Sequence, residues 1–356
     1  MLTRLLRGLR RRPAPILDRL LDADFRRSIY QNFCARDGTA VERALALYLP
    51  AGAAVSVTFD SIKVPHPMSC CWSLERERGS DFIFPIFQPG QLLEVVVERS
   101  LSLFDLFLAA QRTSLRDGWT MISFNDLGAE PGLAFCGNDP GHILLPDFSF
   151  LQSRGYHEAR EYFARNQPAW EERSPRVFWR GSSVGQKHHP ILEMPRARLC
   201  LLAQKMDEEW GDIGLVELFH ISDADAEELR SRQLVKNKVP WKNLSSSRFH
   251  IDIDGHASSY AGLFLKLLSG GLVLKVQSPD HCVQWYYDRL VPGVNFVPVR
   301  GDLSDLVEVV AYYREHAQLA EEIARRGREL ALALTYEKEF AFALRAVERA
   351  FAAAKP

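Results

Sequence analysis

The chain has 356 residues, a length that suits two domains of about 150 residues each. Its composition is 47% hydrophobic and 25% charged, which is typical of a globular protein and excludes a disordered or fibrous chain. Lysine and arginine total 44 and aspartate and glutamate total 45, so the net charge is −1 and the basic excess of a nucleic-acid-binding protein is missing. We therefore expect no nucleic acid among the partners.

The first twelve residues form a basic segment. Residues 1–12 contain five arginines and no acidic residue. No apolar run long enough for a secretory signal follows before Pro13, and no stretch approaches the ~18 apolar residues of a membrane span. The segment has two interpretations: a solvated arm, or an amphipathic stretch resting on anionic lipid headgroups. We expect a cytoplasmic protein that would touch the inner face of the membrane, if at all, through this segment.

The six cysteines are irregularly spaced and include no C-x-x-C pair. This usage is typical of a reduced, cytosolic protein without a disulfide framework or a zinc site. The adjacent histidines 188 and 189 have no third ligand at helix or hairpin spacing. We expect neither a bound metal nor a cofactor.

Strands and helices alternate along the first half of the chain. The hydrophobic pattern predicts a helix over residues 101–113 and four strands. The predicted strands are residues 53–60, 92–98, 119–124 and 142–145.

A polar, helix-prone stretch over residues 154–173, with Pro168 and Pro175 as helix breakers, marks the expected crossover between domains. The strands predicted beyond it are residues 176–179, 215–221, 249–253, 272–276 and 295–299. The helices predicted there are residues 223–233, 260–268, 302–316, 319–334 and 338–354. Alternation of this kind predicts an α/β fold with mainly parallel sheets. We expect domains at 1–165 and 166–335, and a helix at 336–356 that is a candidate to pack back on the first domain.

A loop over residues 178–185 follows one predicted strand of the second half. Ligands of open parallel sheets bind beyond the carboxyl ends of strands, so this loop is a candidate site. Gly181 and Ser182 offer backbone N–H groups and a hydroxyl, and the planar guanidinium of Arg180 suits a diphosphate. A tight turn with Arg180 salt-bridged at the surface is the alternative.

A second loop, residues 252–260, follows the predicted strand 249–253. It places Ser258 or Ser259 where a helix N-cap belongs, and a helix N-terminus presents free N–H groups that suit a phosphate. The two aspartates of the loop, Asp252 and Asp254, share one face of the strand, and one of them could hold ribose hydroxyls. The alternative is a capping and turn role alone.

A third loop, residues 125–132, follows the strand 119–124. An acid on this loop could face the second domain across a cleft, although an ordinary polar turn is the alternative. The chain contains no P-loop, G-x-S-x-G, H-E-x-x-H or G-x-G-x-x-G motif.

Six blocks carry a family resemblance. They are residues 178–182, 249–255, 267–275, 284–292, 295–299 and 302–306. In this order they resemble glycosyltransferase family 90, which includes protein O-glucosyltransferases, fungal capsule xylosyltransferases and bacterial lipopolysaccharide core transferases. The match spans residues 119–340, and the variant at 260–266 is most similar to the bacterial lipopolysaccharide branch.

The resemblance implies a GT-B fold, in which two Rossmann-like domains face a cleft. It also implies inverting, metal-independent transfer from a UDP-sugar that the C-terminal domain holds. Carried over from the family and from the strand-end loops, the candidate donor-binding residues are Arg180, Gly181, Ser182, Lys187, Asp254, Gly255, His256, Ser258, Ser259, Tyr260 and Lys266.

The catalytic base implied by the resemblance is an aspartate at the end of the first-half strand. In the family it lies one residue before a proline or two, and here that stretch is residues 126–131. Asp126 is our first candidate, with Glu130 and Asp147 as fallbacks. A second departure is that eukaryotic members have arginines where this chain has Ala261 and near His188. Lysines 187, 266 and 275 are the candidates to supply that charge.

The resemblance predicts transfer of a hexose or pentose from a UDP-sugar to a glycan or glycolipid acceptor, with lipopolysaccharide core as the first candidate. Capsule glycan or protein is the alternative acceptor. A catalytically impaired nucleotide-sugar-binding protein is the alternative function.

Overall fold

The computed structural model describes residues 31–32, 35, 37–46, 54–58, 69–75, 81–85, 99, 102–110, 118–128, 131–185 and 190–353. The chain divides into two compact units. The first comprises residues up to 155 together with 336–356, and the second comprises residues 156–335. The basic segment 1–12 and the predicted strand 92–98 lie outside the described residues. In the described part of the chain, no helix is both long and apolar enough to cross a membrane.

A six-stranded sheet lies in the first unit, in the order β1-β3-β2-β4-β5-β6. Its strands are β1 (Ala54–Thr58), β2 (Ser69–Glu75), β3 (Asp81–Pro85), β4 (Gly118–Ser123), β5 (Gly132–Ala134) and β6 (His142–Leu144). The sheet is mixed, because β2 runs antiparallel to both β3 and β4 while the other pairs are parallel. Residues 76–80 are too few for the crossover that a parallel β2–β3 pair would need.

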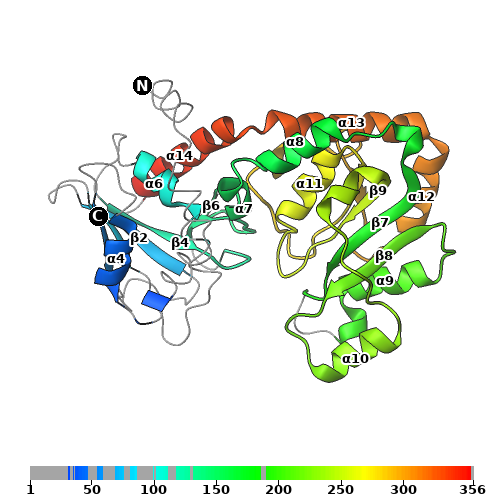
Figure 1. Ribbon diagram of the computed structural model, residues 1–356, viewed down its shortest axis with the longest axis horizontal. Coiled ribbons are helices and arrows are strands. Elements are labelled where there is room, and N and C mark those ends of the chain that lie inside the picture. The colour runs from blue at the N-terminus through cyan, green and yellow to red at the C-terminus, as the bar shows by residue number, and fades with distance from the viewer. Residues whose placement is uncertain are drawn as a thin grey trace. The chain divides into compact units, whose positions relative to one another are not determined.

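The helices of the first unit are α4 (Gly38–Ala46), α6 (Phe104–Ala110), α7 (Phe148–Gln152) and α14 (Tyr336–Ala353). The C-terminal helix α14 lies beside α6 and also contacts β4, β5 and β6 (Figure 1). It buries an apolar stripe that includes Phe340, Leu344 and Val347. The amphipathic pattern of the last helix therefore reflects packing on this sheet.

The second unit contains a five-stranded, fully parallel sheet in the order β11-β10-β9-β7-β8. Its strands are β7 (Ser174–Ser182), β8 (Gly211–Glu217), β9 (Ser247–Asp252), β10 (Leu272–Val276) and β11 (Val297–Val299). The chain proceeds from β7 to β8 in one direction and then places β9 to β11 on the other side of β7. The strand order thus reverses between β7 and β9, the point at which open α/β sheets bind ligands beyond their carboxyl ends.

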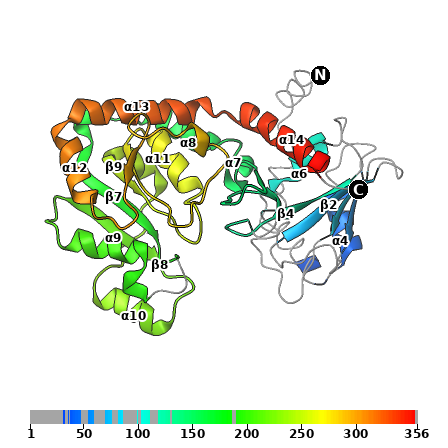
Figure 2. The same cartoon turned by 180° about the vertical axis from the view of Figure 1, so that it is seen from behind.

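Helices cover this sheet. They are α8 (His157–Arg165), α9 (Pro195–Gln204), α10 (Asp223–Ser231), α11 (Ala261–Ser269), α12 (Leu306–Glu315) and α13 (Ala317–Ala333). Short 3₁₀ turns are η2 (Trp170–Glu172), η3 (Ile191–Glu193), η4 (Trp241–Ser246) and η5 (Tyr287–Arg289). Helices α9 and α11 lie on opposite faces of the sheet (Figure 1), as expected from right-handed crossovers on either side of the reversal. Helices α11 and α13 lie side by side in both views (Figures 1 and 2). The predicted α/β class is confirmed.

Strand β9 is buried on both of its faces. Phe249 and Ile251 pack into the apolar core of the unit. His250 and Asp252 point to the opposite face and are fully buried as well. A central parallel strand is covered on both sides by crossover helices, so polar side chains on it must find partners inside the protein. Asp252 therefore takes its hydrogen-bond and ion-pair partners from the protein and not from solvent.

Candidate functional site

A cavity of about 690 Å³ lies beside the reversal point of the second sheet. One part of its wall is apolar and includes Phe178 of β7, Trp241 of η4 and Leu265 of α11. Another part carries polar groups, which include Arg196 and Lys266. Such a pairing of an apolar wall with a few converging polar groups is typical of a site for a small organic anion.

Arg196 links the ends of the two strands that flank the reversal point. It lies in the first turn of α9 and is buried. Its Nε donates to the carbonyl oxygen of Asp254 at 3.0 Å and its Nη2 to that of Ile253 at 3.2 Å. Its Nη1 donates to the carbonyl oxygen and the hydroxyl of Ser182, at 3.2 and 3.1 Å. One guanidinium thus fixes the end of β7 against the loop after β9.

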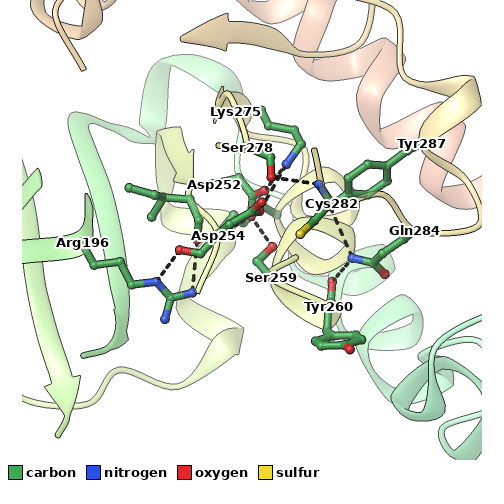
Figure 3. Close-up of polar contacts among 12 residues, drawn as sticks. Arg196, Asp252, Asp254, Ser259, Tyr260, Lys275, Ser278, Cys282, Gln284 and Tyr287 are labelled. Atoms are coloured by element: carbon green, nitrogen blue, oxygen red, sulfur yellow. Dashed lines mark hydrogen bonds and ion pairs between the residues drawn. The ribbon is translucent and has the colours of Figure 1, made fainter. Parts of the chain in front are cut away.

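Asp252 is the centre of a buried charge cluster (Figure 3). Its Oδ1 accepts hydrogen bonds from Ser259 Oγ at 2.5 Å and from Lys266 Nζ at 2.8 Å. Its Oδ2 accepts one from Lys275 Nζ at 3.1 Å. Burial alone would raise the pKa of Asp252, but the two ammonium groups and these hydrogen bonds lower it well below its usual range. The carboxylate is therefore ionised at neutral pH and holds both lysines in place.

Positive charge exceeds negative charge in this cluster. The cations are Arg196, Lys266 and Lys275, and the carboxylates are Asp252 and Asp254. Burial raises the pKa of Asp254, partly opposed by Lys275, whose Nζ lies 3.8 Å from its Oδ1. Burial lowers the pKa of Arg196 to about 10, which still leaves it charged at neutral pH. Buried charges are tolerated when they are paired, so a surplus of cations beside a cavity favours an anionic ligand.

Four of the predicted donor-binding residues line this cavity, namely Arg180, Gly181, Ser259 and Lys266. The guanidinium of Arg180, however, donates to both carboxylate oxygens of Asp212 at 2.8 Å, the salt-bridged alternative considered from the sequence. Asp212 also accepts from Lys236 at 2.8 Å. Arg196, which the sequence does not single out, is the arginine that bridges the two strand ends.

Two glycines allow the backbone to approach closely at the strand ends. A Cβ on Gly255 would lie 2.9 Å from both Arg196 Nη2 and Val184 Cγ2. A Cβ on Gly181 would collide with the ring of Trp179. Both predicted glycines are therefore required by the packing of the strand ends, whatever they bind.

The start of α11 differs from the predicted N-cap. The N-cap residue is Tyr260, with φ of 46° and no capping side chain. Ser259 instead directs its hydroxyl to Asp252, and its carbonyl oxygen accepts from the backbone N–H of Gly262 at 2.8 Å. Ser258 Oγ is buried and has no hydrogen-bond partner within the described residues. A positive φ at a tyrosine is strained backbone of the kind that concentrates in functional loops.

Two further predicted donor-binding residues are His256 and Lys187. The ring of His256 lies 5.7 Å from that of His220, which follows β8, so these histidines connect neighbouring strand-end loops. Lys187 lies outside the described residues.

The candidate bases belong to the first unit. Asp126 follows β4, keeps 36% of its side chain exposed, and places Oδ1 2.6 Å from Nη2 of the buried Arg99. Asp147 is fully buried and caps α7, accepting from the backbone N–H of Phe150 at 2.9 Å. Glu130 lies outside the described residues. Exposure and a fixed orientation favour Asp126, whereas Asp147 has a structural role.

His250 makes stability depend on pH. Its imidazole is fully buried, and burial, reinforced by the charges of Lys266 and Arg173, lowers its pKa to about 3. An unfolded histidine titrates near ~6.5. Between these values only the unfolded chain takes up the proton, so stability is full above about pH 6.5 and falls as the pH falls.

We expect this residue to lower the free energy of unfolding by about 2 kcal/mol between pH 7 and pH 5. Urea unfolding at both values measures it. His250→Gln should remove this part of the dependence, and His157→Gln, on the exposed surface of α8, should retain it. Equal dependence in both variants would contradict the assignment.

Sequence reasoning missed Arg196 and the apolar wall around Trp241. Arg196 lies in the first turn of a helix, where the dipole disfavours positive charge, but this signal could be used only if α9 had been predicted. A residue that violates this rule is expected to have a specific partner. For Trp241 the sequence held no such signal, because only the tertiary fold brings η4 to the wall of the cavity.

Residues 86–343 match the family model described as Glycosyl transferase family 90. Protein O-glucosyltransferase 2 of Danio rerio is 26% identical over 208 residues, which cover 56% of this chain and 38% of that protein. Protein O-glucosyltransferase 3 of Homo sapiens is 24% identical over 209 residues, with the same two coverages. The matched part thus spans about two fifths of these relatives' length.

Among solved structures, Anabaena Alr3699/HepE in complex with UDP-glucose is 14% identical to this chain. The match covers 55% of this chain and 53% of that one, with a TM-score of 0.34. The two folds are only loosely similar at that score.

Proposed function

The chain belongs to glycosyl transferase family 90, and from this premise we propose that it is an inverting, metal-independent transferase. The donor would be a UDP-sugar that carries a hexose or a pentose, and the acceptor a glycan. We assign donor binding to the second unit and acceptor binding to the first. The proposal rests on family membership together with one feature of the site, the cationic surplus beside the cavity.

That surplus suits a nucleoside diphosphate. The leaving UDP gains negative charge as the glycosidic bond breaks, and a metal-independent enzyme needs fixed cations and N–H groups to stabilise it. Arg196 and Lys266 line the cavity at the reversal point of a parallel sheet, where such ligands bind. The apolar wall next to them, which includes Trp241, offers a surface for the nucleobase.

The proposed reaction is a single in-line displacement. The acceptor hydroxyl oxygen forms a bond to the anomeric carbon from the face opposite UDP. The bond between that carbon and the β-phosphate oxygen breaks, and UDP leaves with its electron pair. Asp126 takes the proton of the attacking hydroxyl, with Glu130 and Asp147 as the alternatives. The configuration of the anomeric carbon inverts.

For the acceptor we propose the lipopolysaccharide core, with capsule glycan or protein as alternatives. Protein O-glucosyltransferases are the curated relatives, but the match covers only part of them, so their substrates transfer only as hypotheses. A glycolipid acceptor would suit a cytoplasmic enzyme at the inner face of the membrane. Whether residues 1–12 make that contact stays a prediction, as does the absence of nucleic acid and of a metal.

Two observations favour a second candidate, a catalytically impaired nucleotide-sugar-binding protein. Arg180, predicted to face the phosphates, is paired with Asp212, and Ala261 stands where eukaryotic relatives have an arginine. On this alternative the site binds a donor but stabilises its leaving group too weakly for transfer.

A nucleotide screen tests the proposal. Ligands that bind only the folded state raise the thermal midpoint by mass action. We expect UDP and at least one of UDP-glucose, UDP-galactose and UDP-xylose to raise it, and ADP and GDP to raise it less. Slow release of UDP from the stabilising sugar nucleotide, without acceptor, separates a transferase from a binding protein. No response to any nucleotide would contradict both candidates.

A further inference from the structure

Lys266 occupies an unusual position for a cation. It lies in the second turn of α11, and its Nζ reaches back toward the start of the helix, where a Cβ on Gly262 would come within 3.6 Å of it. Ser259, just before the helix, shares Asp252 Oδ1 with it. A cation beside a helix N-terminus opposes the helix dipole, so it needs a compensating anion.

Asp252 compensates only part of this charge. Its carboxylate is divided between Lys266 and Lys275, at 2.8 and 3.1 Å. Asp254 lies nearer to Lys275, and Arg196 donates to neutral oxygens of Ser182, Ile253 and Asp254. Lys266 is therefore a half-neutralised ammonium with 11% of its side chain exposed, and it lines the cavity.

The missing side chain at residue 262 leaves space beside Ser259 and Lys266 over the first turn of α11. A Cβ on Gly262 would lie 3.3 Å from Ser259 Cβ and 3.4 Å from its Oγ. A larger residue would fill the space over the first turn in which the ammonium of Lys266 lies. Residue 261, one position earlier, is an alanine and brings no charge of its own.

We propose that Lys266 donates to the diphosphate of the bound donor and that Asp252 is a positioning residue which keeps Lys266 charged and aimed at it. This inference rests on the proposed function and goes beyond it, because it assigns one atom, Lys266 Nζ, to the phosphate groups. Ion-paired hydrogen bonds to phosphate are among the strongest that a protein makes.

The groups that face Lys266 decide its protonation. They are Asp252 and His250 of β9, Lys275 of β10 and Arg196 of α9. Burial lowers the pKa of Lys266, and Asp252 opposes that effect. His250, with its pKa near 3, is neutral above pH 6. Without the Asp252 carboxylate, burial and the neighbouring cations would act unopposed and the pKa of Lys266 would fall further.

Calorimetric titration with UDP and with uridine tests the proposal, because uridine lacks the phosphates. We expect Lys266→Met to weaken UDP binding by at least about tenfold and leave uridine binding unchanged, and Lys266→Arg to retain most of the affinity. Lys205→Met, at the exposed end of α9, is the matched control and should bind UDP like the parent. Unchanged UDP affinity in Lys266→Met, or equal losses for UDP and uridine, would overturn the assignment.

The pH dependence separates positioning from simple packing. We expect the UDP affinity of Asp252→Asn, relative to the parent at each pH, to fall as the pH rises, because the lowered pKa of Lys266 leaves less of it charged. In the double variant Asp252→Asn/Lys266→Met this extra dependence should disappear. A parallel loss at every pH would mean that Asp252 only supports the fold.

The outcomes for the parent protein and the variants are distinguishable. If the parent binds no nucleoside diphosphate, the proposed function fails. If it binds UDP and Lys266→Met binds it equally well, only the further inference fails. Should Asp252→Asn not fold, the comparison of Lys266→Met with Lys266→Arg decides alone.

Discussion

Asp126→Asn is expected to lower the rate of sugar transfer by about 10²–10⁴-fold, the contribution typical of a general base, while UDP affinity stays unchanged. The amide keeps the shape of the carboxylate and can still accept from Arg99, whose Nη2 lies 2.6 Å from Asp126 Oδ1. It cannot take the proton of an attacking hydroxyl. Single-turnover transfer and UDP titration on the same preparation measure the two quantities separately.

Two variants of neighbouring acids sharpen this test. Asp139→Asn, in the exposed turn before β6, is the matched control and should transfer sugar normally. Asp147→Ala removes the side-chain cap of α7, so its main effect should be a loss of stability. If Asp126→Asn transfers at close to the parent rate, the base is one of the fallbacks, Glu130 or Asp147. A matching loss of UDP affinity would instead point to a structural role for Asp126.

Long amphipathic helices are predictable from this sequence because their pattern repeats over several turns. The helices predicted over residues 319–334 and 338–354 appear as α13 and α14, with ends shifted by one or two residues. The strand predicted over 215–221 is β8 (Gly211–Glu217), four residues earlier. Its position is set by parallel pairing with β7 and by Ser222, which caps the following helix. Neither constraint is visible in the local hydrophobic pattern.

The mixed sheet of the first unit shows a second limit of prediction from local sequence. Strands β2 and β3 were not predicted, because β-propensity on a half-buried surface depends on cross-strand neighbours that local sequence does not reveal. Helix α9 was not predicted either, since proline at its first position and two arginines weaken the apolar pattern.

In the candidate site, the positions of the loops could be predicted from the sequence, whereas the partners of their side chains could not. Loops at the ends of β7 and β9 follow from strand prediction and the rule that ligands bind there, so Ser182, Gly255 and Ser259 could be selected from sequence. The hydrogen-bond partners of Arg180 and Arg196 could not be predicted in this way. The pairing of Arg180 with Asp212 depends on the register of β7 against β8, and Arg196 contacts Asp254, which lies 58 residues further along the chain. Long-range pairing decides which cation faces a ligand.

Arg196→Met is expected to abolish measurable UDP binding and to lower the free energy of unfolding by roughly 3 kcal/mol, since each buried acceptor left unpaired costs about 1–3 kcal/mol. The variant removes donors from the carbonyl oxygens of Ser182, Ile253 and Asp254 at the ends of β7 and β9, of which those of Ile253 and Asp254 remain buried. The loops on either side of the cavity would then lose their common anchor. Urea unfolding and UDP titration measure the two effects.

Arg196→Lys distinguishes an anchor from a charge. Lysine keeps the positive charge but has a single nitrogen, so it cannot reach both strand-end loops as the planar guanidinium does. If anchoring is the main role, Arg196→Lys should resemble Arg196→Met; recovery of UDP affinity by lysine would show that charge alone is needed. Arg198→Met, on the exposed side of the same helix, should leave both measurements unchanged. Because Arg196 bonds to backbone and Lys266 to a carboxylate, we expect the first to act on both stability and affinity and the second chiefly on affinity.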